Sequence, residues 1–322
     1  MAMLSCMIIY LDQNKWIDLA RVRSGSPEGQ KYQEVYQKIK EKVSTGEWKF
    51  PLSSVHYMEV FAIRDPVQRK NLIDTMLEIG GRFYIRPYLV LQLIELQKQI
   101  ALKLDIPAPE HSPFSNSFCE LLGIDPSQLK IEGGPITKLL SPNFDYAAYI
   151  ENLPDPFSFM LSSGYKKEDL EKLSEIWQNS IAELEDLKAE LSDLSDKDKL
   201  EKLLIKSFHS EIEHRLSHIL NQIGVNATVI EEMIQDKERL VSILQLVPTL
   251  NLHNRLKLRH FKNKSKKTHR NDIKDFAFLA SALPYVDIVI AEKLLVSYSK
   301  QEKIESEYNV KISNDLNFLL SL

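Results

Sequence analysis

The chain has 322 residues, of which 43% are hydrophobic and 27% are charged, and its formal net charge is −4. It has no apolar stretch long enough to span a bilayer, and residues 1–11 lack the basic start of a signal peptide. Two cysteines, Cys6 and Cys119, are too few for a disulfide framework or a thiolate metal site. We therefore expect a soluble cytoplasmic protein without membrane contact, whose core is large enough for one or two domains.

The first candidate functional residue follows a short apolar run. Residues Met7–Leu11 are aliphatic, β-branched or aromatic, which predicts a buried strand, and Asp12 comes directly after it. Ligands of open parallel sheets bind outside the carboxyl ends of the strands, so Asp12 is a candidate for chemistry. We expect Asn14 to hydrogen-bond Asp12 or a metal-bound water. The alternative for Asp12 is the N-cap of a helix that starts near Lys15.

A second carboxylate lies on the apolar face of a predicted helix. Glu59 falls inside the apolar stripe to which Val55 and Met58 belong. A carboxylate on such a face needs a compensating cation, either a metal ion or an arginine. The alternative to a functional role is therefore a structural ion pair with Arg64 or Arg69.

The next acids lie near the C-terminus. Asp272 and Asp275 fall in the first turn of a predicted helix whose apolar residues stand at positions 276, 279, 280 and 283, on the same face as the two acids. The helix dipole is the alternative explanation, because it favours any acid in a first turn. Pro284 ends this helix, residues 286–290 read as another buried strand, and Glu292 lies just past its end.

Carboxylates gathered at one sheet edge repel each other unless cations lie between them, and oxygen ligands select hard cations. We therefore expect one or two Mg²⁺ or Mn²⁺ ions, one polarising a water and the other stabilising the leaving oxygen. The predicted metal ligands and catalytic residues are Asp12, Glu59, Asp272, Asp275 and Glu292. Among them, Asp272 is either a second ligand or a residue that orients Asp275.

Four segments that carry acidic residues follow one another along the chain. The first is a strand followed by an acid, the second is a helix that carries an acid, the third is a helix that begins with acids, and the fourth is another strand followed by an acid. They are Tyr10–Asn14, Ser54–Glu59, Asp275–Ala282 and Ile288–Lys293, and residues 308–322 form a last strand and helix. This order resembles the PIN domain, a nuclease fold. The family usually has Thr-x-Asp after its fourth strand, whereas this chain has Ile290-Ala291-Glu292.

The resemblance implies a three-layer α/β/α fold with a parallel sheet. It also implies a metal-dependent endoribonuclease that cuts RNA to leave a 5′ phosphate. Such domains often serve as the toxin or effector of a regulated system, which is a further expectation for this chain.

Positive charge is concentrated just before Asp272. Residues 239–271 hold nine basic residues and no acidic one, which leaves −13 on the remainder of the chain. The nine are Arg239, Arg255, Lys257, Arg259, Lys262, Lys264, Lys266, Lys267 and Arg270. A cationic segment beside the acids would attract a phosphodiester backbone, so we expect a nucleic-acid partner, with RNA favoured by the resemblance. The alternative is a solvated loop or a docking site for an acidic surface. The predicted substrate-binding residues are Asn14, Lys266, Lys267, Arg270, Lys274 and Lys293.

A long helical pattern separates the two regions that carry the motifs. We expect PIN-like parts at 1–104 and 246–322, interrupted by a large all-helical insertion at 105–245. Its leucine-rich pattern from Leu173 to Ile219, broken near Ser195–Asp198, predicts two antiparallel helices. Their apolar faces make the insertion a candidate contact surface for a homo-oligomer or a regulatory protein.

Three other functions remain open from the sequence. A structure-specific DNA nuclease would use the same acids, and the 2′-hydroxyl of the substrate would distinguish it from a ribonuclease. A catalytically inactive nucleic-acid-binding module would keep the basic segment and use the acids as caps and ion pairs. A helical scaffold would show no salt-dependent affinity for nucleic acid.

Overall fold

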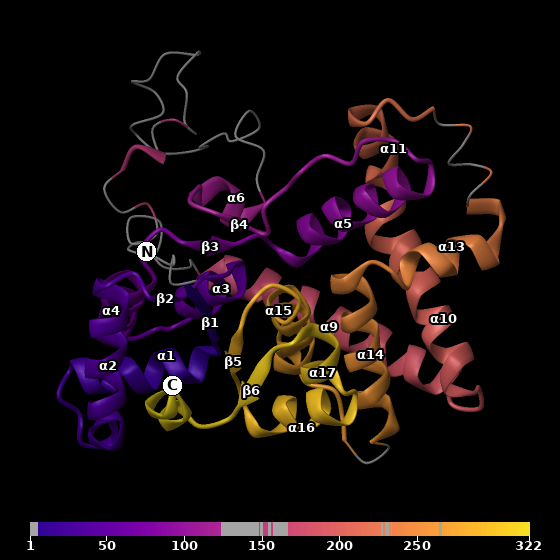
Figure 1. Ribbon diagram of the computed structural model, residues 1–322. Helices are drawn as coiled ribbons and strands as arrows, with labels where there is room; N and C mark the ends of the chain where they lie inside the picture. The colour runs from indigo at the N-terminus through magenta and orange to yellow at the C-terminus, as the bar shows by residue number, and fades with distance from the viewer. Residues whose placement is uncertain are drawn as a thin grey trace.

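The computed structural model shows a four-stranded parallel sheet (Figure 1). Its order is β2 (Trp48–Lys49), β1 (Met7–Leu11), β5 (Ile288–Ile290) and β6 (Lys311–Ser313). The sheet confirms the predicted α/β class and the two predicted buried strands. The described residues are 6–123, 148, 151–153, 156, 167–226, 228, 232, 234–263 and 266–322.

The strand order reverses between β1 and β5. Leu52, just after β2, forms a parallel bridge to Tyr84 of β3 (Tyr84–Ile85). On this side of β1, the strands therefore follow in chain order, first β2 and then β3. On the other side, Leu11 of β1 pairs with Ile290 of β5. A crevice opens at the carboxyl ends of two strands where the order of a parallel sheet reverses. The residues that follow β1 and β5 are therefore placed for ligand binding.

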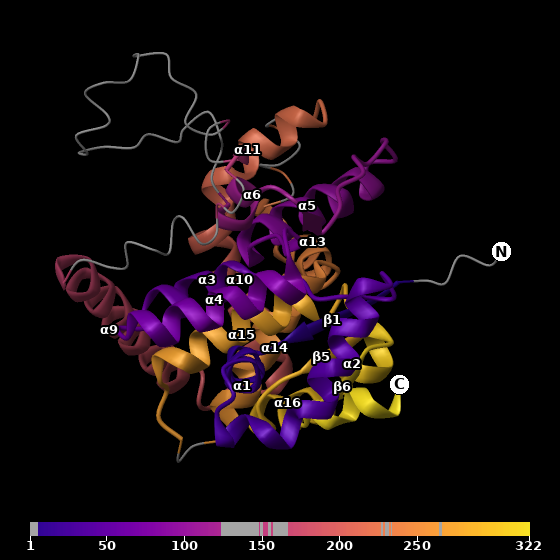
Figure 2. The ribbon, with the colours of Figure 1, turned by 90° about the vertical axis from the view of Figure 1, so that its left-hand side faces the viewer.

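Helices cover both faces of the sheet. Ile9 and Leu11 pack on one face against α1 (Gln13–Arg23), α2 (Gln33–Ser44) and α4 (Pro66–Gly80), from whose side Figure 2 views the molecule. Tyr10 and Val289 pack on the opposite face, because successive side chains of a strand alternate. The helices there are α14 (Pro248–Lys262), α15 (Arg270–Ala282), α16 (Lys293–Gln301) and α17 (Ile304–Tyr308). The sheet is thus the middle of three layers.

A second core lies among helices only. It joins α5 (Tyr88–Lys103), α10 (Asp196–Ser207), α11 (Glu213–Gln222), α13 (Lys237–Leu244) and the start of α14. The π-helical turn η3 (Phe208–Ile212) connects α10 to α11. Before α10, the Ser195 hydroxyl accepts a hydrogen bond from the Asp198 N–H, which confirms the predicted break. The helix before the break, α9 (Lys167–Glu190), packs on α10 and α14 through Leu184 and Leu187.

The segment 105–245 is not entirely helical, so this part of the prediction is wrong. β4 (Phe114–Ser115) pairs antiparallel with β3, because the short strand β3 offers its free edge to a returning chain, and α6 (Phe118–Leu122) follows. Moreover, α5 and α14 contribute to both the sheet core and the helical core. The side chains of Leu173, Ile176 and Trp177 lie outside the described residues. Within the described ranges, no helix has the length and apolar character needed to cross a membrane.

Glu95 joins the helical segment to the start of α14. Its buried carboxylate accepts a hydrogen bond from the Thr249 N–H at 2.8 Å and further ones from the hydroxyls of Thr249 and Tyr285. Burial raises the pKa of Glu95 to about 7, although these hydrogen bonds act in the opposite direction. The folded protein therefore binds a proton at Glu95 more tightly than the unfolded chain does.

Replacing Glu95 with glutamine should change how stability depends on pH. Because the folded-state pKa lies above the usual value of 4.5, the contribution of Glu95 is present at low pH and is lost as pH rises to about 7. From pH 5 to pH 8, the difference in unfolding free energy between Glu95→Gln and wild type should therefore shift by about 2–3 kcal/mol in favour of the variant. Urea unfolding at both pH values measures this difference, and a difference that does not vary with pH would contradict it.

Candidate active site

Two carboxylates follow the strands between which the order reverses. Asp12 follows β1, and its N–H donates to the Ile290 carbonyl of β5 at 2.9 Å, while Glu292 comes two residues after β5. Both occupy the N-cap positions of the helices that follow, α1 and α16, yet neither side chain forms a capping hydrogen bond. Capping therefore does not account for either carboxylate.

Helices α3 (Ser54–Phe61) and α15 bring two more carboxylates to the same place, Glu59 and Asp275. Burial raises the pKa of Asp12 to about 7, and the negative charges of Glu292 and Glu59 add to this rise. Burial also raises the pKa of Asp275 to about 8, with further contributions from Asp12, Glu59 and Glu292. Asp12, Glu59, Asp275 and Glu292, hereafter the carboxylate cluster, thus come from four separate segments of the chain and share one electrostatic environment.

The position of Glu59 depends on contacts between α3 and the end of β1. The Nε2–H of His56 donates to the Leu11 carbonyl at 2.8 Å, and its Nδ1 accepts from the Ser53 N–H at 3.1 Å. The Ser53 hydroxyl in turn hydrogen-bonds the Tyr10 hydroxyl at 2.7 Å. Burial lowers the pKa of His56 to about 4, so the ring stays neutral and keeps both hydrogen bonds. These contacts fix the first turn of α3, and Glu59 lies one turn further along.

Sequence reasoning missed this anchor. Ser53 and His56 form a capping box. In a sequence this motif appears as a serine followed, three residues later, by a side chain that accepts a hydrogen bond from the serine N–H. Its usual last member is Glu or Gln, so a histidine there hides the signal. The tertiary bond from His56 to Leu11 leaves no mark in the sequence.

Lys274 partly compensates the cluster. Its Nζ lies 2.6 Å from Glu59 Oε1, and the two side chains are only 12% and 19% exposed, respectively. The alternative for Glu59, an ion pair with Arg64 or Arg69, names the wrong partners, because the cation comes from α15, which also carries Asp275. Asn14 donates its side-chain N–H to Glu292, whereas we expected Asp12 or a water. The start of α1 turns Asn14 toward the end of β5.

Asp272 lies apart from the cluster. It accepts hydrogen bonds from the Lys266 ammonium and from the His269 N–H, the latter at 2.8 Å, and so caps the start of α15. A carboxylate at the third helical position turns back toward the unpaired N–H groups before it. In this structure Asp272 therefore caps the helix and pairs with Lys266, and its predicted role beside Asp275 stays a prediction.

The donor set of the cluster suits a hard divalent cation, although within the described residues no three His, Cys, Asp or Glu side chains are already arranged to hold a metal ion. The Asp12 Oδ2 atom is buried and has no hydrogen-bond partner among these residues, so it is available as a ligand. Asp12 and Asp275 would hold such an ion, whereas Glu59 and Glu292 are engaged with Lys274 and Asn14 in this structure.

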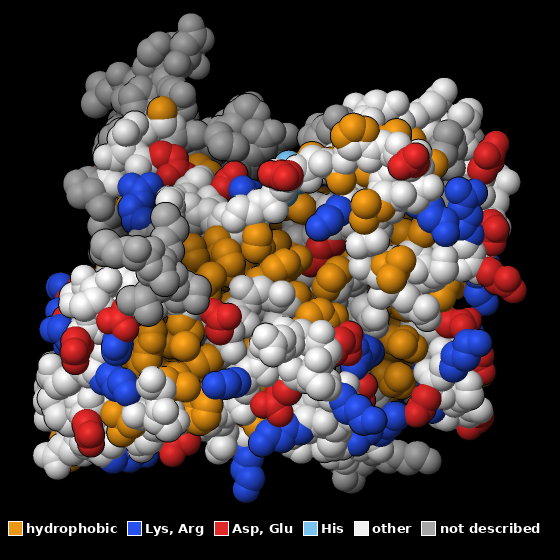
Figure 3. All heavy atoms as spheres, in the orientation of Figure 1, with side chains coloured by type: hydrophobic (Ala, Val, Ile, Leu, Met, Phe, Trp, Pro, Cys, Tyr) orange, Lys and Arg blue, Asp and Glu red, His pale blue; other side chains and the backbone are white. Residues whose placement is uncertain are grey.

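The basic segment is less cationic on the surface than its composition predicts. Three of its members are neutralised in ion pairs: Arg255 with Glu302 and Glu307, Lys262 with Asp196, and Lys266 with Asp272. Lys267 and Arg270 are exposed just before and at the start of α15, Lys293 is exposed at the start of α16, and Lys264 lies outside the described residues. On the face in Figure 3, red and blue side chains alternate without a continuous basic surface.

Comparisons with protein-family models, with curated proteins and with solved structures give no match for this chain.

Replacing Asp275 with asparagine should stabilise the protein at alkaline pH. Because the folded-state pKa of about 8 lies above the usual 3.8, wild type loses stability as pH rises between these values. Asparagine avoids this loss, so at pH 8.5 the variant should be more stable by at least about 1 kcal/mol, with a smaller advantage at pH 5.

Asp272→Asn is the matched comparison on the same helix. It keeps an oxygen that can accept from the His269 N–H but removes the charge that pairs with Lys266 and favours the helix start, so it should destabilise the protein by about 1 kcal/mol. Thermal unfolding at both pH values measures the two effects. A lower melting temperature for Asp275→Asn than for wild type at pH 8.5 would show that Asp275 is not under electrostatic strain.

Proposed function

We propose that this protein is a metal-dependent endoribonuclease of the PIN-like type, with the carboxylate cluster as its active site. The observation that carries the proposal is the position of Asp12 and Asp275. They lie far apart in the chain, yet the fold brings them together at the reversal point of the parallel sheet. There burial, and after it the charge of Asp12, raises the pKa of Asp275. Buried carboxylates with raised pKa values in a crevice are typical of catalytic and metal-binding sites.

The residues of the cluster would divide the work of phosphodiester hydrolysis. Asp12 and Asp275 would bind the cations and release their protons as they do so. When bound, Mg²⁺ or Mn²⁺ supplies an acidified water and positive charge at the leaving oxygen. Lys274 would become available to a phosphate oxygen of the substrate if Glu59 left it to hold a metal ion. Glu292, held by Asn14, would complete the ligand set.

The surface cations near the cluster support a polyanionic substrate. Lys267, Arg270 and Lys293 are exposed, and the described residues offer no carboxylate within 4 Å of any of them. Their charges would hold the phosphodiester backbone while the cluster acts on one bond. The choice of RNA over DNA follows from the resemblance to PIN domains, and a panel of matched RNA and DNA substrates tests it.

Cleavage should depend on two members of the cluster. Wild type with Mn²⁺ should cut single-stranded RNA, and Asp12→Asn and Asp275→Asn should each lower the rate by more than about 100-fold, because each loses a cation ligand. Asp272→Asn should keep most of the activity, since Asp272 faces Lys266 and the helix start. Gel analysis of a labelled RNA measures the rates. Equal rates for wild type, Asp12→Asn and Asp275→Asn would refute the proposed active site.

RNA binding should weaken with salt and with loss of the exposed cations. In the inactive Asp275→Asn background, Lys267→Ala and Arg270→Ala should each reduce the slope of log affinity against log salt by about 0.7–0.9, the contribution of one phosphate contact. Lys262→Ala is the control, because Lys262 is already paired with Asp196 at 2.6 Å. Fluorescence anisotropy at several salt concentrations gives the slopes. The same slope for all these proteins would mean that the backbone binds elsewhere.

A further inference from the structure

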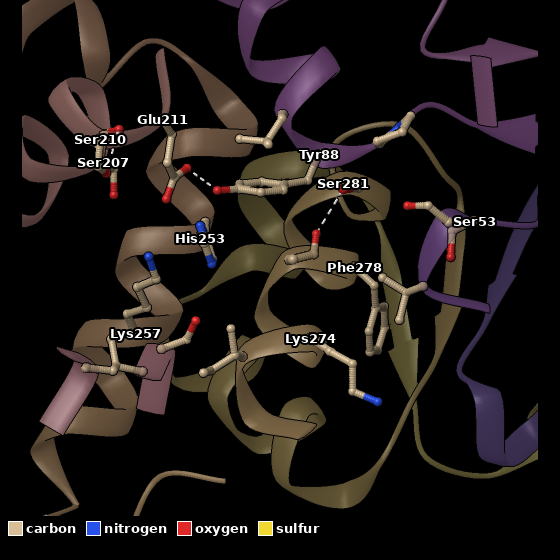
Figure 4. A pocket seen from close by; sticks show the side chains of 18 of the residues that line it. Ser53, Tyr88, Ser207, Ser210, Glu211, His253, Lys257, Lys274, Phe278 and Ser281 are labelled. Atoms are coloured by element: carbon tan, nitrogen blue, oxygen red, sulfur yellow. Dashed lines mark hydrogen bonds between the residues drawn. The ribbon is translucent and has the colours of Figure 1, made fainter. Parts of the chain in front are cut away.

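A cavity of about 450 Å³ lies between the sheet domain and the helical segment (Figure 4). Helices α3 and α15 line one side, and α9, α10, η3 and α14 line the other, with the start of α5 between them. Its volume is within the range of small-molecule sites. No member of the carboxylate cluster is among the described residues that line it, although Lys274, which pairs with Glu59, lies on the wall that faces the cluster.

A buried histidine offers two hydrogen-bonding atoms in this cavity. His253 is 3% exposed, and neither ring nitrogen has a hydrogen-bond partner within the described part of the chain. Burial lowers the pKa of His253 well below its usual value, so the ring is neutral and presents one donor and one acceptor. Its ring packs edge-on against Tyr88, with 4.8 Å between the ring centroids, which holds it in place. Buried polar atoms are normally hydrogen-bonded, so both nitrogens suit a ligand that carries a donor and an acceptor.

Two ammonium groups belong to the same cavity. Lys257 follows His253 by one turn of α14 and extends toward it in Figure 4, and Lys206 comes from α10. Burial lowers the pKa of Lys257, the negative charge of Glu211 acts in the opposite direction, and the positive charge of Lys206 lowers it further. Neither lysine has a carboxylate within 4 Å among the described residues. An anion between them would relieve their mutual repulsion.

The remaining lining provides an acceptor and an apolar wall. Glu211, in the π-helical turn η3, accepts a hydrogen bond from the Tyr88 hydroxyl, as the dashed line in Figure 4 shows. π-Helical turns are frequent at functional sites. Leu184, Leu187 and Leu203 line the cavity from α9 and α10. The ligand that matches this set carries a negative group, hydroxyl donors and a flat, largely apolar ring.

We infer that this cavity binds a nucleoside 5′-monophosphate unit. The phosphate lies between Lys206 and Lys257, a ribose hydroxyl donates to Glu211, and the base packs on the leucines with its polar edge on His253. Lysine ammonium groups are common phosphate ligands, and carboxylates often accept from ribose hydroxyls. The unit is either a free mononucleotide or one nucleotide of an RNA strand, because both present the same groups.

Calorimetric titration of the full chain in EDTA tests the inference independently of metal binding and cleavage. The probes are AMP, GMP, CMP and UMP, with adenosine and inorganic phosphate as partial ligands. At least one monophosphate should bind at micromolar to low millimolar concentration, and adenosine and phosphate should each bind at least about tenfold more weakly. No binding of any monophosphate, or equal binding of adenosine and AMP, would overturn the inference.

Two variants test the assigned lysines against a matched control. Lys257→Met and Lys206→Met should each weaken monophosphate binding by about tenfold or more, whereas Lys202→Met, one turn before Lys206 on α10 and outside this cavity, should bind as wild type does. If Lys257→Met does not fold, Lys206→Met decides the result alone. Unchanged binding in the folded lysine variants would overturn the assignment.

A 5′-phosphorylated RNA trinucleotide, titrated into Asp275→Asn, separates the two sources of the ligand. Tighter binding than the best monophosphate assigns the cavity to a strand, and weaker binding assigns it to a free nucleotide. Because the titrations contain no divalent cation, they can succeed even if the chain cleaves no RNA, and they can fail even if it does.

Discussion

Repulsion among Asp12, Glu59, Asp275 and Glu292 is the constraint around which this structure is organised. Burial raises the pKa values of Asp12 and Asp275, and the negative charges of the neighbouring carboxylates raise them further. The fold reduces the repulsion by protonation of Asp12 and Asp275 near neutral pH, by the ammonium of Lys274 and by the amide of Asn14. Apolar residues of similar size would avoid this cost entirely, and sites that sacrifice stability in this way are commonly functional.

The backbone keeps the charges from moving apart. The register of β1 and β5 places Asp12 beside Ile290, and the bond from His56 to the Leu11 carbonyl holds α3, with Glu59, against the same strand end. Lys274 then connects the cluster to the cavity beneath the helical segment, because it bonds Glu59 and also lines that cavity.

The sequence was sufficient for the elements that depend on local pattern. Short apolar runs with β-branched residues located β1 and β5, and the helical period placed Glu59 and Asp275 on α3 and α15. The sequence did not predict which of several possible partners a side chain contacts in the folded structure. Asp272 and Asp275 share a helical turn, but capping turns Asp272 toward Lys266, and Glu59 pairs with Lys274 from the far end of the chain. The strand β4 was missed because two residues carry no periodicity.

The central claim is that the carboxylate cluster is a cation site, and direct binding of Mn²⁺ tests it most simply. Calorimetric titration of wild type at pH 8 should show one or two Mn²⁺ ions bound per chain, with release of protons on binding because Asp12 and Asp275 have raised pKa values. The folded Asp12→Asn, Asp275→Asn double variant should bind none of them. Binding of the same number of ions by the double variant, or no binding by wild type, would contradict the account.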